Sequence, residues 1–144
     1  MIFPANEATP EDPWLDVWDS DAEFGRQTLN GLNPVVIKRV KAIPEKFPVT
    51  DKDVGKLLTR GMSLREEAAA GNIYMVDFEI LEGIPTGWKG LKKGKGAQLE
   101  LAAAMALFYH EPSDDQLLPI AIQLGQAPGP DCPIWTPLDS REDW

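Results

Sequence analysis

Residues 74–80 read Tyr74-Met75-Val76-Asp77-Phe78-Glu79-Ile80, and an apolar or aromatic side chain stands at every second position. This two-residue repeat is typical of a β-strand with one face in water. A less regular alternation covers residues 99–107, and a third runs through residues 118–124 after a polar turn at residues 111–116. We therefore predict an antiparallel β meander in residues 72–124.

Two short helices are predicted before the meander. Thr50 followed by Asp53 is a capping signal for the first helix. Ser63 and Glu66 form a capping box for the second helix, and Gly71 would end it. Both helices are interpreted as connectors that organise the backbone and carry no chemistry.

A third helix and an extended segment are predicted nearer the N-terminus. Asp19 or Ser20 would cap a helix that runs to Asn30, and Gly31 would end it in a left-handed conformation. Residues 33–40 (NPVVIKRV) are β-branched after a proline, so we expect them to be extended and packed.

These elements define an α+β fold, with short helices in the N-terminal half followed by a small antiparallel meander. The 144 residues amount to one domain or less. We divide them into an irregular arm (1–13), helices and extended segments (14–71), the meander (72–124) and a Pro-rich loop (125–144).

The composition excludes several classes of protein. A net charge of -9, from 23 acidic and 14 basic residues, argues against a nucleic-acid binder, because phosphate binding needs a concentrated positive surface. The longest apolar stretch, residues 101–109, is much shorter than the roughly 18 residues of a membrane span. The N-terminus does not read as a signal peptide. A single cysteine, Cys132, fits a reducing compartment, so a cytoplasmic location is expected.

One basic cluster stands out in residues 87–96, where Lys89, Lys92, Lys93 and Lys95 alternate with glycines. A patch that binds phosphate or anionic lipid is one interpretation of this cluster. A solvated hairpin tip is the other, and we favour it because glycine and lysine are common in exposed turns.

Two side chains are candidates for nucleophilic, acid–base or metal chemistry. His110 is the only histidine, and its functional reading is a general base or a metal ligand. It has no second histidine or thiol at ligand spacing, so we interpret it as a turn histidine. Cys132 stands between Asp131 and Pro133 with no nearby base, which argues against a catalytic thiolate.

The carboxylates also lack a catalytic pattern. Asp77 and Glu79 share one strand face and could pair as acid and base, but a solvated outer face accounts for the alternation. Asp114 and Asp115 lack the alternating oxygen ligands and the glycine of a calcium loop. The residues alone therefore predict a soluble α+β piece without a recognisable active site.

Several stretches, taken together, resemble the animal lipoxygenases, and the resemblance covers nearly the whole chain after residue 14. They follow the family's order and spacing, namely residues 21–37 (DAEFGRQTLNGLNPVVI), 43–51 (IPEKFPVTD), 71–84 (GNIYMVDFEILEGI), 118–124 (LPIAIQL), 128–131 (PGPD) and 133–137 (PIWTP), ending at 143–144 (DW). Arg26 departs from the pattern, because some relatives carry an aromatic residue there.

The resemblance implies a section of a mainly helical catalytic domain. Lipoxygenases are non-haem iron dioxygenases that add molecular oxygen to polyunsaturated fatty acids. In the family, the helix that carries the first two iron-binding histidines begins directly after the residues that match Asp143 and Trp144. The resemblance therefore assigns no catalytic, cofactor-binding or metal-binding residue to a numbered position here, and we expect no cofactor for this chain alone.

The partners implied are the fatty acid and O2, through the parent enzyme, and the rest of its catalytic domain. Membrane contact would come through the family's N-terminal β-sandwich, which this sequence does not match. Three functions stay open: a fragment of a fatty-acid dioxygenase, a non-catalytic binding or regulatory module derived from that domain, and a stand-alone enzyme. The last fits poorly, because a facial-triad iron site needs two imidazoles and a carboxylate and the chain has one histidine.

Overall fold

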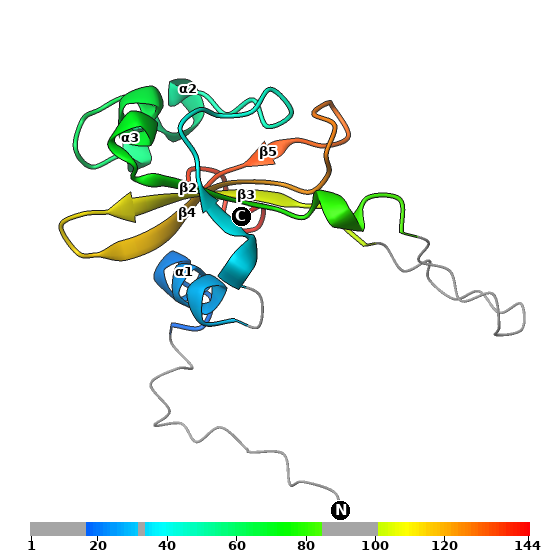
Figure 1. The fold of residues 1–144 in the computed structure, drawn as a ribbon, viewed down its shortest axis with the longest axis horizontal. Coiled ribbons are helices and arrows are strands. Elements are labelled where there is room, and N and C mark those ends of the chain that lie inside the picture. The colour runs from blue at the N-terminus through cyan, green and yellow to red at the C-terminus, as the bar shows by residue number, and fades with distance from the viewer. Residues whose placement is uncertain (1–16, 32–33, 85–100) are drawn as a thin grey trace, which may run out of the picture.

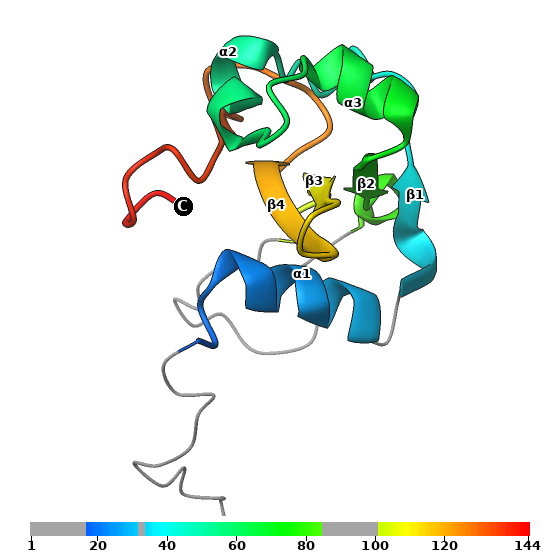
Figure 2. The same ribbon diagram turned by 90° about the vertical axis from the view of Figure 1, so that its left-hand side faces the viewer.

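The computed structural model describes residues 17–31, 34–84 and 101–144. An antiparallel five-stranded sheet in the order β1-β2-β3-β4-β5 forms the centre of these residues. Helix α1 covers one face of the sheet, while α2 and α3 lie over the other (Figure 1, Figure 2). The elements are β1 (Ile37–Arg39), β2 (Ile73–Asp77), β3 (Met105–Glu111), β4 (Gln116–Gln123), β5 (Ile134–Trp135), α1 (Asp21–Asn30), α2 (Asp51–Val54) and α3 (Leu64–Ala70). The predicted α+β class, with short helices and an antiparallel sheet, is confirmed.

The sheet is wider than the predicted meander. β1 pairs with β2 and β5 pairs with β4, so strands from before residue 72 and after residue 124 extend both edges. These strands have three and two residues, too few to give an alternation signal. The alternation expected from residue 99 becomes a strand only at Met105, and residues 99–100 lie outside the described part of the chain.

The segment predicted to be extended and packed at residues 33–40 is only partly so. Pro34–Val36 form a 3-10 turn, and only Ile37–Arg39 form a strand. The fixed φ of proline suits the first turn of a helix, which explains why the β-branched residues after it do not stay extended. Val35 is 79% exposed, so the packing expected there is wrong.

The strand predicted through Ile80 ends at Asp77. One Asp77 carboxylate oxygen, Oδ1, accepts the backbone N–H of Glu79 at 3.0 Å, and Glu79–Leu81 turn into a 3-10 helix. This side-chain bond competes with the sheet ladder, as is common for aspartate. Ile80 is left 83% exposed, so the alternation that included it gave the wrong strand end.

Strand β3 is buried on both faces. Met105, Leu107 and Tyr109 are fully buried in a core that also holds Phe47 and Val54, on the side of α2 and α3. Phe108 belongs to a separate cluster on the side of α1. The pairing of β3 with β4 shifts register between Leu107 and Phe108, where Pro119 pairs with Phe108. A bulge of this kind tolerates a proline in an inner strand.

The caps of the two connector helices are confirmed. The Ser63 hydroxyl accepts the Glu66 N–H at 3.3 Å, and the Glu66 carboxylate accepts the Ser63 N–H at 2.9 Å. Gly71 ends α3 at φ +90°, the left-handed region that glycine enters without a steric cost. Asp53 accepts the Thr50 N–H at 2.8 Å, so the first cap forms as predicted.

A polar junction centred on Lys46 ties the loop before α2 to the sheet. The Lys46 ammonium group lies 2.7 Å from Asp77 Oδ2 and 2.8 Å from Glu79 Oε2, and it donates to Gln126 Oε1 at 2.7 Å. Gln126 in turn donates to Asp77 Oδ1 at 2.9 Å and to the carbonyl of Ala103. The Lys46 junction therefore joins four separate segments of the chain.

The prediction of a solvated face is wrong for Asp77 and is confirmed for Glu79. The Asp77 side chain is only 23% exposed, while that of Glu79 is 68% exposed. Burial raises the pKa of Asp77, but the hydrogen bonds from Lys46 and Gln126 outweigh it and hold that pKa below its ordinary value. The hydrogen bond with Asp77 likewise raises the pKa of Lys46.

Replacing Lys46 by methionine tests the junction. Lys46→Met leaves the partly buried Asp77 carboxylate without its cation, so we expect the free energy of unfolding to fall by about 1 kcal/mol. Denaturant titration followed by tryptophan fluorescence measures the change. The matched control is Lys52→Met on the exposed surface of α2. An equal effect in both variants would show that the junction adds nothing.

Candidate functional site

Three pockets of the described residues lie beside helix α1, and a further one of about 500 Å³ lies between residues 41–51 and α3. The Ser20 hydroxyl accepts the Glu23 N–H at 3.2 Å, which confirms Ser20 as the N-cap of α1. Gly31 ends the helix with φ -70° and ψ 176°, so the predicted left-handed conformation is wrong. A Cβ added at Gly31 would lie 2.9 Å from the Gln27 carbonyl oxygen. Glycine therefore provides space at this helix end rather than a positive φ.

Gly25 sets how closely α1 approaches the sheet. A Cβ added there would lie 1.7 Å from the carbonyl oxygen of Leu117, on β4. No side chain fits at that distance, so the helix rests on the strand backbone to backbone. The sequence does not predict this contact, because an isolated glycine within a helix indicates only a low local helix propensity.

Gly25→Ala is predicted to destabilise the protein, although alanine is the better helix former by about 1 kcal/mol. The steric contact with Leu117 would force α1 away from β4, and overpacking of this kind costs about 1–3 kcal/mol. Thermal unfolding measures the effect. Gly55→Ala serves as the control, since Gly55 has φ -57° and its added Cβ has no neighbour nearer than 4.0 Å. A Gly25→Ala protein as stable as this control would contradict the close approach.

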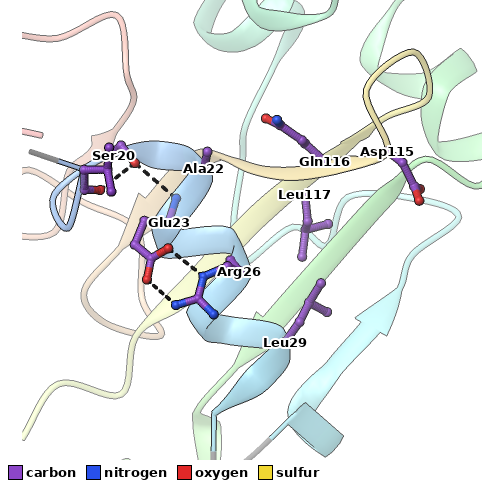
Figure 3. Close-up of a pocket in the computed structure, with 9 residues that line it drawn as sticks. Ser20, Ala22, Glu23, Arg26, Leu29, Asp115, Gln116 and Leu117 are labelled. Atoms are coloured by element: carbon purple, nitrogen blue, oxygen red, sulfur yellow. Dashed lines mark hydrogen bonds and ion pairs between the residues drawn. The ribbon is translucent and has the colours of Figure 1, made fainter. Parts of the chain in front are cut away.

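A pocket of about 380 Å³ lies between α1 and the start of β4 (Figure 3). Its walls are mostly apolar, with Val17, Ala22, Leu29 and Leu117 among them. The polar part consists of Ser20, Glu23 and Arg26 at α1 together with Asp115 and Gln116 at the start of β4.

The carboxylate of Glu23 is fully engaged within α1. Arg26 donates to its two oxygens at 2.6 and 2.5 Å, and Gln27 Nε2 donates to Oε1 at 2.9 Å. The hydrogen bonds from Arg26, and then from Gln27, lower the pKa of Glu23 to about 2. A carboxylate with this pKa stays ionised near neutral pH and is a poor proton acceptor, so the pocket has no general base in Glu23.

The pair makes stability depend on pH in the acid range. The pKa of Glu23 falls from 4.5 to about 2 on folding, so its stabilising effect is present above pH 4.5 and is lost as the pH falls toward 2. We expect Glu23→Gln to give a shallower loss of thermal stability between these pH values than the parent chain. The control is Glu82→Gln at an exposed position. Identical pH profiles for the Glu23→Gln and parent proteins would contradict the assignment.

An apolar groove of about 410 Å³ lies on the other flank of α1. We call it the α1 groove and define it by Phe24, Val36, Val76, Phe78, Ala106 and Phe108. Phe24 stacks on Phe108 with ring centroids 6.0 Å apart and an interplanar angle of 17°. The groove exposes the sheet face that α1 covers only in part, and it contains no ionisable side chain.

A third pocket, of about 330 Å³, joins the start of α1 to the C-terminal segment. The Trp144 indole donates to Asp21 Oδ1 at 2.7 Å, and Arg141 donates to Asp19 Oδ2 at 2.9 Å. These contacts connect residues more than 120 positions apart, so the tertiary fold alone creates them.

Glu67 on α3 and Glu111 on β3 are buried acids held by neighbouring groups, and Arg60 Nη1 lies 3.4 Å from Glu67 Oε2. Asn72 donates to Glu67 Oε2 at 2.6 Å. Glu111 accepts the Thr59 hydroxyl and, at 3.1 Å, the Ser113 N–H. The hydrogen bond from Thr59 is the main cause that lowers the pKa of Glu111. Burial raises the pKa of Tyr109. Both shifts keep the groups in their usual charge states at neutral pH, which indicates a structural cluster. Sequence reasoning missed these residues, because isolated glutamates usually lie on the surface.

The side chains singled out from the sequence are not assembled into one site. His110 lies on β3 beside the hairpin turn, with Nε2 2.8 Å from Asp115 Oδ1. Cys132 is half-buried in the loop before β5, where its N–H donates to the Gly129 carbonyl at 3.0 Å. The Lys/Gly cluster of residues 87–96 lies outside the described residues.

The described residues do not provide a set of ligands for the iron that the resemblance implies. In the part of the chain that the structure describes, no three His, Cys, Asp or Glu side chains group so that they could hold a metal ion. His110 is the single imidazole of the sequence, and a carboxylate from its own hairpin is its neighbour. No helix within the described ranges has the length and apolar character to cross a membrane.

Comparison with known proteins identifies the family. The sequence profile described as Lipoxygenase matches residues 2–136. "Arachidonate 12-lipoxygenase, 12R-type" from Mus musculus is 46% identical over 143 residues, which are 99% of this chain and 20% of that protein. "Polyunsaturated fatty acid lipoxygenase ALOX15B" from Rattus norvegicus is 49% identical over 127 residues, 88% of this chain and 18% of that protein.

A solved structure agrees with the sequence comparison. That of a calcium-dependent 11R-lipoxygenase superposes with a TM-score of 0.77 at 43% identity, and the match covers 90% of this chain and 18% of that one. The sheet and its helices are thus those of a section of a lipoxygenase fold. The chain belongs to the lipoxygenase family, which confirms the resemblance seen in the sequence. It spans about a fifth of the length of the curated relatives it matches.

Proposed function

We propose that this chain is an internal section of a lipoxygenase catalytic domain and that it acts there as scaffold, without supplying iron ligands. The observation that carries the proposal is the match of 99% of the chain to 20% of a lipoxygenase. The lack of a three-ligand group among the described residues supports it. The ionisation state of the acidic side chains also supports the proposal. Glu23, Asp77 and Glu111 each accept hydrogen bonds that favour the ionised form.

The parent protein is proposed to add molecular oxygen to a polyunsaturated fatty acid and so give a hydroperoxide. The names of the arachidonate and polyunsaturated fatty acid relatives support this substrate class. Non-haem iron, when bound by the parent, would supply the oxygen chemistry. The residues of this chain would hold the sheet and α1 in place through the Lys46 junction and the Gly25 contact. A cytoplasmic setting stays a prediction.

A non-catalytic module derived from the same domain is the second candidate. One observation favours it: the sheet has helices on both faces and a core of fully buried residues such as Phe47 and Tyr109. An element with its own core can fold without the rest of the parent domain. Reading the coding sequence beyond Trp144 separates the two candidates, because a histidine-rich helix there favours the scaffold of an enzyme and a stop codon favours the module.

The scaffold proposal predicts that the chain alone does not oxidise fatty acids. The purified chain is incubated with ferrous iron and either linoleate or arachidonate, and the absorbance of conjugated dienes is followed. We expect no product above a heat-treated control and no iron retained after dialysis, because His110 has no second imidazole to complete a site. Diene formation together with one equivalent of retained iron would refute the proposal.

A further inference from the structure

Helix α1 ends on an asparagine that is followed by a glycine. Asn30 is the last residue of the helix, at the end nearest β1, and Gly31 is the residue after it (Figure 2). Both residues are exposed to solvent. Gly31 has no side chain to shield its backbone nitrogen. Water and dissolved bases can therefore reach the peptide bond that joins the two residues.

The end of α1 lacks the capping motif that closes α3. Gly71 ends α3 at φ +90°, and its N–H donates to the carbonyl groups of Ala68 and Glu67. Gly31 instead has φ -70° and ψ 176°, outside the left-handed region that such a cap requires. The last turn of α1 also carries no basic residue to interact with its carbonyl groups. This turn is therefore the one that frays, and fraying releases Asn30 from helical geometry.

We propose that Asn30 and Gly31 form a site of spontaneous deamidation in the folded protein. The Gly31 backbone nitrogen loses its proton to a base in solvent and attacks Cγ of the Asn30 side chain. A bond forms between this nitrogen and Cγ, and the bond between Cγ and Nδ2 breaks. Nδ2 leaves as ammonia after taking a proton from solvent, so no net proton is consumed. The product is a five-membered succinimide ring.

Water then opens the ring in one of two directions. Addition of water at Cγ gives aspartate at position 30. Addition at the former backbone carbonyl carbon gives isoaspartate, in which the main chain runs through Cγ and is one methylene group longer. Both products carry a carboxylate in place of the neutral amide, and water is the only co-reactant. The inference goes beyond the proposed function and does not depend on the activity of the parent protein.

The fold keeps glycine at the reactive position. A Cβ added at Gly31 would lie 2.9 Å from the carbonyl oxygen of Gln27, so a residue that could shield the backbone nitrogen does not fit without a shift of the chain. The space that glycine provides at the end of α1 therefore also leaves the neighbouring Asn30 open to attack.

Two other asparagines lack this combination of features. Asn33 precedes Pro34, whose nitrogen carries no proton to lose. Asn72 precedes the β-branched Ile73, and its Nδ2 donates to Glu67 Oε2 at 2.6 Å. Its side chain is therefore held by the protein, whereas the Asn30 side chain lies at an exposed helix end.

Deamidation is expected to loosen the end of α1. The new carboxylate lies at the C-terminus of a helix, where the macrodipole is already negative. Gly31 also lines the α1 groove, so the charge enters beside an apolar hollow. Isoaspartate in addition lengthens the main chain between α1 and β1. The reaction therefore weakens the attachment of α1 to the sheet as the protein ages.

The test follows position 30 in the complete 144-residue chain, kept folded in water labelled with heavy oxygen. Peptide mass spectrometry measures the label gained at each asparagine, and electron-transfer fragmentation separates isoaspartate from aspartate. We expect both products at position 30, at a rate within about tenfold of that in a peptide of residues 26–35, because a frayed helix end opens at almost no free-energy cost. Asn72 is the internal control and should react at least about tenfold more slowly, since its hydrogen bond to Glu67 must break first.

Two variants separate the reaction from its consequence. Asn30→Gln keeps a neutral amide but cannot form the five-membered ring, so we expect it to gain no label. Asn30→Asp carries the charge of the product and should lower the thermal midpoint by about 2–4 °C at low salt relative to Asn30→Gln. The difference should shrink at high salt, because an exposed charge is screened there.

The outcomes decide the proposal. Label gained at Asn30 with both products, and little at Asn72, supports it. An Asn30 that keeps its amide in the folded chain while the peptide reacts would overturn it, because the end of α1 would then be closed. Equal rates at Asn30 and Asn72 would also overturn it, since global unfolding and not the helix end would be the cause. An Asn30→Asp protein as stable as Asn30→Gln at low salt would contradict the loosening of α1.

Discussion

Strand β3 cannot face water on either side, and the remaining elements are arranged to meet that constraint. Its residues alternate between two cores: Leu107 and Tyr109 are buried with Phe47 toward α2 and α3, and Phe108 is buried toward α1. An antiparallel sheet can leave one face wet, but a strand with large apolar side chains on both faces needs a cover on each. The layered fold of helix, sheet and helix follows from this one strand (Figure 2).

The two covers are attached by different physical means. On one side, α2 and α3 are short, and their caps and the Lys46 junction fix the chain around them. On the other side, α1 is longer and rests on β4 through the contact of Gly25 with the Leu117 carbonyl. Because α1 contacts β4 through its backbone, the helix covers only a narrow part of the sheet. Hollows therefore remain on both flanks of the helix. The α1 groove is one of these hollows, and the pocket between α1 and the start of β4 is another.

The acidic side chains with shifted pKa values in the described residues are held in their ionised forms. Glu23, Asp77 and Glu111 each accept hydrogen bonds that favour their ionised forms, and Lys46 is held between two carboxylates. Catalytic acids and bases need the opposite arrangement, with a pKa moved toward the working pH. The chain belongs to the lipoxygenase family and covers about a fifth of the length of its relatives.

The sequence by itself determined the features that depend on neighbouring residues. The capping signal at Thr50, the capping box at Ser63, the helix end at Gly71 and the core strands of the meander were all readable, because their causes lie within a few positions of one another. The family was readable too, since it depends on the order of whole blocks of residues. No such local cause exists for the contacts that join distant segments.

Only the tertiary structure decided how the sheet is completed and covered. The edge strands β1 and β5 and the ion pair between Lys46 and Asp77 depend on partners far along the chain. The need for glycine at position 25 is set by Leu117, 92 positions away, and no pattern around residue 25 encodes that distance. Periodicity and capping act over one or two turns of backbone, whereas close packing is a property of the folded chain as a whole.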